Sequence, residues 1–213
     1  MATQLKNGQK ILFIGDSITD CGRRDSQRPL GGGYVKLLAD LLIIREPARR
    51  ITIINKGIGG DSVVGLRNRW TDDVLRNHPD WLAIKIGIND LHNYLFNGGK
   101  ELAPRPYEAA YREILERTRA ALPKCRILLI DPFYISRDAA SNSRRKHVLD
   151  LMPDYLAVVE KLSRTFKTRH IKTHELFGRL LQCHEPDTFC AEPVHPNLTG
   201  HLAIAEAVYE ALS

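Results

Sequence analysis

Four short motifs, spread over the whole chain, carry the residue types that acyl transfer requires. Ser17 follows an apolar run directly, in the segment Gly-Asp-Ser, and a serine hydroxyl attacks an ester carbonyl when a base activates it. His195, near the C-terminus, is the residue type used most often as that base. Gly60 and Asn89 offer a backbone N–H and a side-chain amide that can stabilise an oxyanion. The four motifs together predict nucleophilic catalysis on an ester.

The spacing around His195 suggests a third catalytic group. Glu192 precedes it by three positions, so a helical turn between them would place both side chains on the same side. The carboxylate would then hold one tautomer of the imidazole. The predicted oxyanion hole consists of the Ser17 N–H, the Gly60 N–H and the Asn89 amide. The loss of one such donor typically slows a reaction by roughly a hundred- to a thousandfold.

Each motif also has an ordinary structural interpretation. Asp16 can cap a turn, Asn89 can cap a helix, and the glycines around Gly60 can form a loop with positive φ. His195 can be a structural histidine. Four motifs that follow one another in the right order after successive strands favour the catalytic interpretation.

Apolar runs alternate with amphipathic segments along the chain, which predicts strands and helices in turn. We expect strands at residues 11–14, 51–54, 81–86, 127–130 and 171–173. We expect helices at residues 34–44, 64–77, 106–122, 149–166 and 198–212, with Pro153 disturbing the start of the fourth.

This alternation predicts an α/β fold: a three-layer α/β/α sandwich with about five parallel strands, whose apolar character on both faces suits a covered sheet. Residues 1–213 are expected to form one domain. Residues that follow parallel strands gather at one sheet edge, which would bring the four motifs together. The polar segment 133–145 is expected to be a long loop near that edge.

The composition of the chain argues against nucleic-acid binding and against membrane insertion. The net charge of +6 comes from small clusters such as Arg23-Arg24, so we expect a solvated basic surface and no nucleic-acid binding, with a weak attraction for acidic substrates. No apolar run approaches the roughly 18 residues of a membrane span. The polar N-terminus lacks a secretion signal, which predicts a cytoplasmic protein with no membrane partner. The cysteines are expected to be free thiols: Cys21, Cys125, Cys183 and Cys190.

The sequence lacks the motifs that mark several other kinds of functional site. The chain contains no G-x-G-x-x-G after its first strand and no phosphate-binding G-x-x-x-x-G-K-[ST] loop. Its histidines and cysteines do not have metal-ligand spacing. The G-x-S-x-G elbow of α/β-hydrolases is also missing. We therefore predict no cofactor, no metal and a serine hydrolase of another family.

The four blocks resemble those of the SGNH hydrolases, also called the GDSL esterase/lipase family, over about residues 11–201. The resemblance implies a flavodoxin-like α/β/α fold with Ser17 as nucleophile, Gly60 and Asn89 as oxyanion donors and His195 as base. This family usually has aspartate three residues before the histidine, where this chain has Glu192. Asp187 is a poorer substitute because its offset does not match.

Longer stretches are similar to the intracellular GDSL acetyl xylan esterases that deacetylate xylo-oligosaccharides, among them GDSITDCGR (15–23), NKGIGG (55–60) and IGIND (86–90). This similarity implies a small-molecule or oligosaccharide ester as substrate and a possible homo-oligomer. Candidate substrate contacts are Asp16 and the aromatic residues Tyr34, Tyr94, Phe133 and Tyr134, whose rings can stack on sugars.

The leading hypothesis is a serine esterase for short acyl esters, in particular O-acetyl groups on carbohydrate. One alternative is a lysophospholipase or thioesterase of the same family, which would need a long apolar acyl groove. The other is a non-catalytic carbohydrate-binding module that keeps the fold without turnover.

Overall fold

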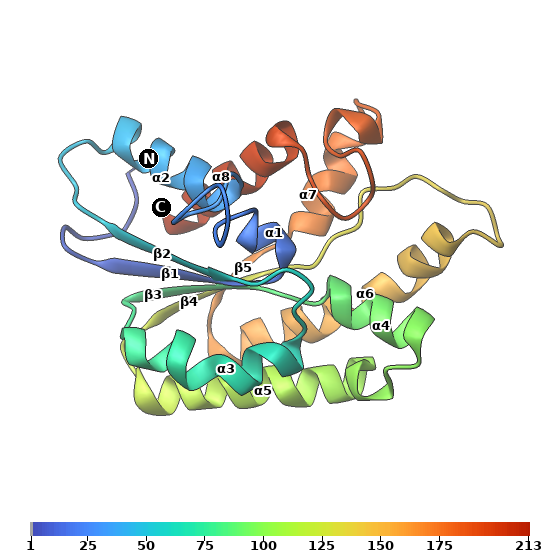
Figure 1. Ribbon diagram of the computed structural model, residues 1–213, viewed down its shortest axis with the longest axis horizontal. Coiled ribbons are helices and arrows are strands. Elements are labelled where there is room, and N and C mark those ends of the chain that lie inside the picture. Colours follow the sequence, from blue (N-terminus) through green and yellow to red (C-terminus); the bar gives the residue numbers. More distant parts are fainter. Residues whose placement is uncertain (1) are drawn as a thin grey trace.

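The computed structural model describes residues 2–213 and has a parallel sheet at its centre (Figure 1). Its five strands are β1 (Lys10–Gly15), β2 (Thr52–Gly57), β3 (Trp81–Lys85), β4 (Arg126–Ile130) and β5 (Arg169–Ile171). They lie in the order β2-β1-β3-β4-β5, and every neighbouring pair is parallel. The predicted α/β/α sandwich and its five parallel strands are confirmed.

Helices cover both faces of the sheet (Figure 1). One layer holds α1 (Ser17–Asp20), α2 (Tyr34–Arg45), α7 (Thr173–Leu180) and α8 (Leu198–Leu212). The opposite layer holds α3 (Val63–Asp73), α4 (Ile88–Asn97), α5 (Pro104–Ala121) and α6 (Arg144–Phe166). Short 3₁₀ turns occur at η1 (Leu75–Asn77), η2 (Lys100–Leu102) and η3 (Pro186–Thr188).

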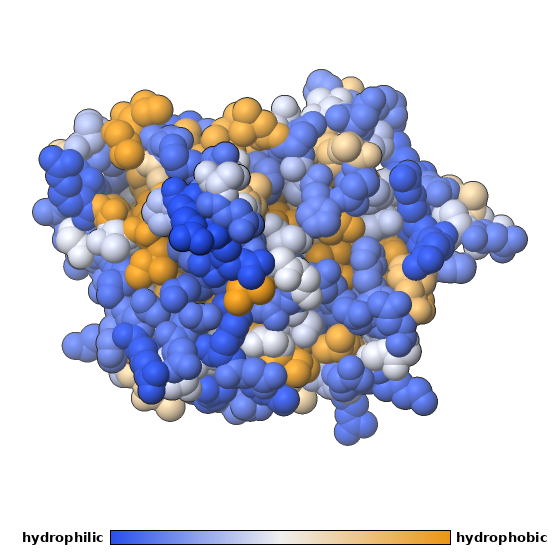
Figure 2. Space-filling view, in the orientation of Figure 1, coloured by the Kyte–Doolittle hydropathy of each residue, from blue (hydrophilic) through white to orange (hydrophobic). Residues whose placement is uncertain are grey.

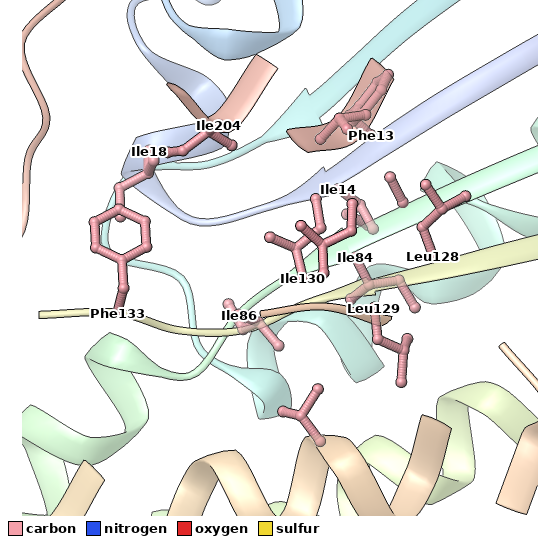
Figure 3. Packing of buried hydrophobic residues seen from close by; sticks show 14 of the residues in the cluster. Phe13, Ile14, Ile18, Ile84, Ile86, Leu128, Leu129, Ile130, Phe133 and Ile204 are labelled. Atoms are coloured by element: carbon pink, nitrogen blue, oxygen red, sulfur yellow. The ribbon is translucent and has the colours of Figure 1, made fainter. Parts of the chain in front are cut away.

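The buried hydrophobic residues pack on both sides of the central strands (Figure 3). Side chains alternate along each strand, so consecutive apolar residues of β1 serve both layers. On one side, Phe13 packs edge-on against Tyr34 of α2. On the other side, the indole N–H of Trp70 in α3 donates to Thr118 of α5 at 3.0 Å. The apolar runs of the central strands therefore contribute side chains to a hydrophobic core on each face of the sheet.

Several predicted boundaries were wrong for local reasons. Helix α6 begins at Arg144 instead of residue 149, because the Ser143 side chain caps it by accepting from the Lys146 N–H. Pro153 lies inside this helix and does not interrupt it. Helix α3 ends at Asp73, and residues 75–77 form the separate turn η1. Helices α4 and α7 were not predicted, and Thr173 begins α7 where the last strand was expected to continue.

The four motifs all reach the carboxyl edge of the sheet. Ser17 follows β1, Gly60 follows β2, and Asn89 follows β3, while His195 lies in the loop before α8. The predicted long loop after β4 is present, although its last two residues already belong to α6. The sheet order places β1 between β2 and β3, so Ser17 lies between the other two strand ends.

Candidate active site

Ser17 and His195 form the centre of the site. Ser17 is the first residue of α1, and its Oγ lies 2.8 Å from Nε2 of His195, which is 178 residues away in the sequence. Asp16 caps the short helix by accepting from the Ile18 N–H at 3.0 Å, and this fixes the backbone at Ser17. The half-buried serine thus faces a ring nitrogen that can take its proton.

Glu192 completes a line of three groups. One carboxylate oxygen contacts Nδ1 of His195, so the neutral ring carries its hydrogen there and leaves Nε2 as the acceptor toward Ser17. The predicted contact is present, but the predicted helical turn is wrong, since residues 191–195 form a bent loop. The carboxylate instead accepts the backbone N–H groups of Val194 at 3.0 Å and His195 at 2.7 Å.

These contacts keep Glu192 ionised. Partial burial works to raise the pKa of its carboxyl, but the two backbone N–H groups and the imidazole outweigh burial and lower the pKa below its ordinary value. The site therefore has a carboxylate, and not a carboxylic acid, behind the imidazole at neutral pH. Glu192, three residues before His195, makes the contact with the imidazole, as the spacing suggested. Asp187, the poorer candidate in the sequence, lies in the turn η3.

The predicted oxyanion donors Gly60 and Asn89 follow β2 and β3, the two strands on either side of β1. Gly60 has φ +79°, a left-handed conformation that favours glycine, and no residue within the described chain accepts its N–H. The neighbouring glycine lies close, since a Cβ built on Gly59 would be 3.9 Å from Cβ of Ser17. The Asn89 amide donates one hydrogen to the carbonyl of Asp61 at 2.9 Å, which leaves its second hydrogen for a ligand.

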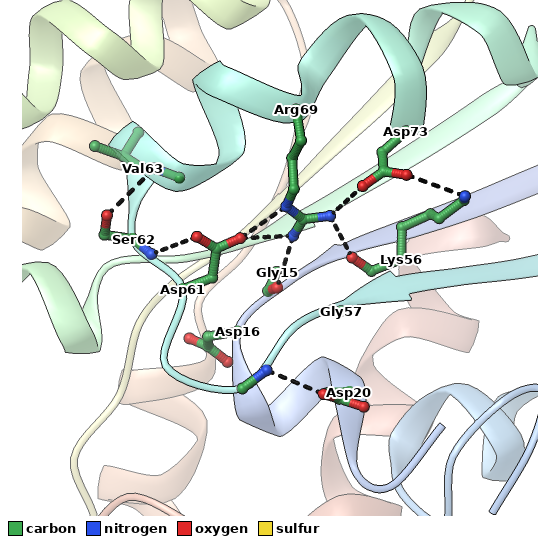
Figure 4. A network of polar contacts seen from close by, with 12 residues as sticks. Gly15, Asp16, Asp20, Lys56, Gly57, Asp61, Ser62, Val63, Arg69 and Asp73 are labelled. Atoms are coloured by element: carbon green, nitrogen blue, oxygen red, sulfur yellow. Dashed lines mark hydrogen bonds and ion pairs between the residues drawn. The ribbon is translucent and has the colours of Figure 1, made fainter. Parts of the chain in front are cut away.

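Arg69 of α3 holds this side of the site together (Figure 4). Its guanidinium donates to the Asp61 carboxylate at 2.8 Å and to the Asp73 carboxylate at 2.7 Å. It also donates to the carbonyl of Lys56, the next-to-last residue of β2, at 2.7 Å, and to that of Gly15, the last residue of β1, at 3.3 Å. Asp61 in turn anchors Asn89. Arg69 thus connects strands β1 and β2 to the loop of Gly60 and, through Asp61, to Asn89 of α4.

No catalytic or supporting role was predicted for Arg69. Its spacing of four residues from Asp73 places both side chains on one face of a helix. Helix spacing of this kind usually marks an ordinary surface ion pair. The contacts with the strand ends depend on the packing of α3 against the sheet, which no local pattern reports.

Comparison with known proteins identifies the family. Residues 13–203 match the family model described as GDSL-like Lipase/Acylhydrolase. The chain belongs to this family. It is accordingly a carboxylic ester hydrolase, with the fold that the sequence resemblance implied.

Several relatives cover almost the whole chain. An acetylxylan esterase of Geobacillus stearothermophilus is 35% identical over 96% of this chain and 94% of its own length. A crystal structure of an acetylxylan esterase from that organism superposes with a TM-score of 0.87 and 32% identity, covering 99% of this chain and 96% of the other. The uncharacterised Bacillus subtilis protein YpmR is 25% identical over 99% of this chain and 84% of its own.

Solved structures of the Geobacillus esterase include catalytic mutants. In these mutants alanine replaces a serine, an aspartate or a histidine, and the aspartate stands three positions before the histidine. The same spacing separates Glu192 from His195 in this chain.

The structure gives Asp16 a supporting position in this GDSL-family site. Its side chain is fully buried, so the predicted contact with substrate is wrong. Besides capping α1, its carboxylate lies 3.3 Å from the ammonium of Lys85, which is also fully buried. Burial lowers the pKa of Lys85, and the negative charge of Asp16 opposes that change. The pair supports the backbone on which Ser17 stands.

Asp90, next to Asn89, is a second buried carboxyl beneath the site. One of its oxygens accepts the Val63 N–H at 2.9 Å, and the other has no partner within residues 2–213. Burial raises the pKa of Asp90 to about 7, although the Val63 N–H acts to lower it. The group therefore changes its protonation near neutral pH.

The aromatic candidates divide into two pairs. Tyr34 and Phe133 are fully buried in the core, so they are packing residues and not sugar platforms. Tyr94 is half-buried on α4, and Tyr134 keeps a small exposed edge while its ring packs against His92. Substrate contact by Tyr94 and Tyr134 stays a prediction.

Three general expectations concern the whole chain. All four cysteines are free thiols, as predicted. No helix within residues 2–213 has the length and apolar character needed to cross a membrane. In the same residues, no three His, Cys, Asp or Glu side chains gather as metal ligands. The absence of a metal or cofactor in the working enzyme stays a prediction.

Proposed function

We propose that this esterase removes short acyl groups, in particular O-acetyl groups on carbohydrate, through an acyl-enzyme on Ser17. The observation that carries the proposal is the continuous line of contacts from Ser17 Oγ through His195 to Glu192. A serine hydroxyl is a weak nucleophile by itself, and such a line is the arrangement that activates it.

The reaction then proceeds in two halves. Ser17 Oγ attacks the ester carbonyl while Nε2 of His195 takes its proton, and Glu192 stabilises the imidazolium that forms. The oxyanion accepts hydrogen bonds from the N–H groups of Ser17 and Gly60 and from the Asn89 amide. Collapse expels the sugar alcohol, which receives the proton from His195. A water molecule, deprotonated by His195, releases the acid and restores Ser17.

The acetylated sugar is proposed from the relatives. The Geobacillus protein of 35% identity is an acetylxylan esterase, and its catalytic mutants change the same three kinds of position. The replacement of aspartate by Glu192 is compatible with this role, since the longer side chain still contacts Nδ1 of His195. A cytoplasmic location, a homo-oligomer and a single domain over residues 1–213 remain predictions.

The decisive experiment compares p-nitrophenyl acetate with p-nitrophenyl octanoate, using the native enzyme, Ser17→Ala and the control Ser141→Ala at an exposed serine. We expect fast turnover of acetate, no loss in Ser141→Ala, and a fall of roughly a thousandfold or more in Ser17→Ala. Acetate release from acetylated xylo-oligosaccharides should then follow the same pattern.

Other outcomes would favour the alternatives. A preference for octanoate would point to a lysophospholipase or thioesterase. Full activity in Ser17→Ala would refute the proposed nucleophile, and no turnover of any ester by a folded native protein would favour a binding module.

A further inference from the structure

A basic groove lies beside the candidate active site. Arg23, Arg24, Arg28 and Lys56 line it, together with apolar residues that include Leu30 and Ile53. The groove measures about 620 Å³ and runs between the loop that joins α1 to α2 and the edge strand β2. Figure 2 shows strongly hydrophilic side chains gathered over this loop, next to an apolar area. Its volume is in the range of small-molecule sites.

The positive charge of the groove is only partly neutralised. Arg24 donates its Nε to Asp20 at 2.8 Å, and Lys56 contacts Asp73 at 3.0 Å, a carboxylate already shared with Arg69. Arg28 and Arg23 donate to backbone carbonyls and to no carboxylate in the described chain.

The terminal guanidinium nitrogens of two of these side chains are available to a ligand. Among residues 2–213, those of Arg23 and Arg24 have no acceptor. Burial lowers the pKa of Arg23, and the positive charges of Arg24 and Arg69 act in the same direction against the opposing effect of Asp20. The lining of the groove thus carries four cations and no carboxylate, and terminal nitrogens of Arg23 and Arg24 remain able to donate to an anionic ligand.

One cation of the groove, Arg24, lies near the candidate nucleophile. A Cβ built on Gly59 would lie 3.7 Å from Nη2 of Arg24 and 3.9 Å from Cβ of Ser17. Nη2 of Arg24 and Cβ of Ser17 are therefore no farther apart than the sum of these two distances. One substituted sugar ring can span that separation. The Asp20 carboxylate that holds Arg24 also accepts the Gly59 N–H at 3.0 Å, so the cation and the glycine loop share one anchor.

We propose that this groove is a subsite for a carboxylate on the acyl-bearing substrate, such as the carboxylate of a uronic acid. The inference rests on the proposed esterase function and names a substrate class for it. A planar guanidinium matches a carboxylate through two parallel hydrogen bonds, and two guanidinium groups here present unpaired nitrogens. The groove would hold the charged substituent while Ser17 attacks an acetyl ester on the same ring or its neighbour.

Three esters with one ring geometry test the subsite. They are methyl tri-O-acetyl-β-xylopyranoside, the tri-O-acetylated methyl β-glucuronoside, which adds a carboxylate at C5, and the carboxamide of that glucuronoside. We expect kcat/KM for acetate release from the acid to exceed that from the amide by about tenfold at low salt. The advantage should largely disappear at about 1 M salt, where the screening length falls to roughly 3 Å. This comparison needs no variant and so does not depend on the folding of a mutant.

Arginine variants then locate the effect. In Arg24→Gln and Arg28→Gln the ratio of kcat/KM for acid and amide should fall toward one. The control is Arg76→Gln, at an exposed arginine of η1 that pairs with Asp72, and it should keep the ratio of the native enzyme. Arg28→Gln removes contacts with a single backbone carbonyl, so it serves if Arg24→Gln fails to fold.

Two results would overturn the inference, and they are distinguishable. If the native enzyme hydrolyses the xyloside but shows no preference for the acid over the amide, the subsite is wrong and the esterase proposal stands. If it cleaves p-nitrophenyl acetate but none of the three sugars, the carbohydrate proposal itself fails and the subsite fails with it.

Discussion

The two halves of the candidate active site are supported in different ways. The half that carries Ser17, Gly60 and Asn89 is supported by the fully buried pair of Asp16 and Lys85, and by the largely buried Arg69 between Asp61 and Asp73. The other half is the loop of Glu192 and His195, whose side chains are 48% and 58% exposed and whose contacts are local.

This difference has a physical reason. Oxyanion donors act only if they are already in position when charge develops, so their support must be rigid and protected from water. The imidazole needs one tautomer and one orientation, which a carboxylate three residues away can supply within a short loop. Changes in the exposed half should therefore reduce the rate alone, whereas changes in the buried half should reduce both the rate and the stability.

The largest effect on rate is expected for His195→Ala. Without a base the serine is not activated, so kcat for p-nitrophenyl acetate should fall by roughly a thousandfold or more. The thermal midpoint should stay close to that of the native enzyme, because the side chain is exposed and packs against little. Calorimetry and kinetics of the variant check this expectation. A clear drop in the thermal midpoint would show that the exposed half also contributes to stability.

Glu192→Gln should have the next largest effect. The amide keeps the size of the side chain but removes the charge that stabilises the imidazolium, so kcat should fall by about a hundredfold. Glu192→Asp is the matched variant, and its shorter carboxylate should keep the rate within about tenfold of native. Equal rates in all three enzymes would mean that Glu192 only shapes the loop.

Arg69→Met tests the buried half. It leaves Asp61 and Asp73 without their shared cation, so the free energy of unfolding should drop by about 2 kcal/mol. Because Asp61 anchors Asn89, kcat should also fall, by about tenfold. Arg67→Met on the same helix is the control, since its contact with Glu113 is longer and exposed. Urea unfolding and kinetics of both variants decide whether stability and rate change together.

The smallest effect on rate is expected for Asp90→Asn, which alters the pH dependence of stability instead. Burial raises the pKa of Asp90 to about 7 in the folded protein, above about 3.9 in the unfolded chain. The folded state therefore binds more protons, so the contribution of Asp90 is complete below about pH 4 and is lost as the pH rises through 7. Asparagine has no such titration, and its side-chain oxygen can still accept the Val63 N–H.

Urea unfolding at pH 5 and pH 8 measures this effect. The native protein should lose stability relative to Asp90→Asn by at least about 1 kcal/mol across this range. Burial lowers the pKa of His201 to about 4. His201 is present in both proteins, so its contribution to the pH dependence of stability cancels in the difference between them. A difference in stability that does not change with pH would show that Asp90 is not ionising there.

The sequence pattern predicted the strands better than the short helices. The central strands β1, β3 and β4 were found because their apolar runs are buried on both faces. The edge strands β2 and β5 are only partly buried, and the predicted last strand overlaps β5 at Ile171 alone. Helix α4 was missed because it begins directly at Ile88 after Gly87, whose φ of +136° lets the chain turn without a loop. Helix α7 was missed because its eight residues are too few for a clear periodicity.

The sequence by itself determined the succession of the five strands along the chain, the family, and the candidate catalytic residues Ser17, Glu192 and His195. These depend on local pattern and on short spacing, which a linear chain reports directly. Only the tertiary structure decided that Asp16 is buried against Lys85, that Arg69 joins strands β1 and β2, and that Arg24 of the basic groove lies near Ser17. Such contacts join segments that are distant in sequence, and they follow from the sheet order and the packing of helices on it.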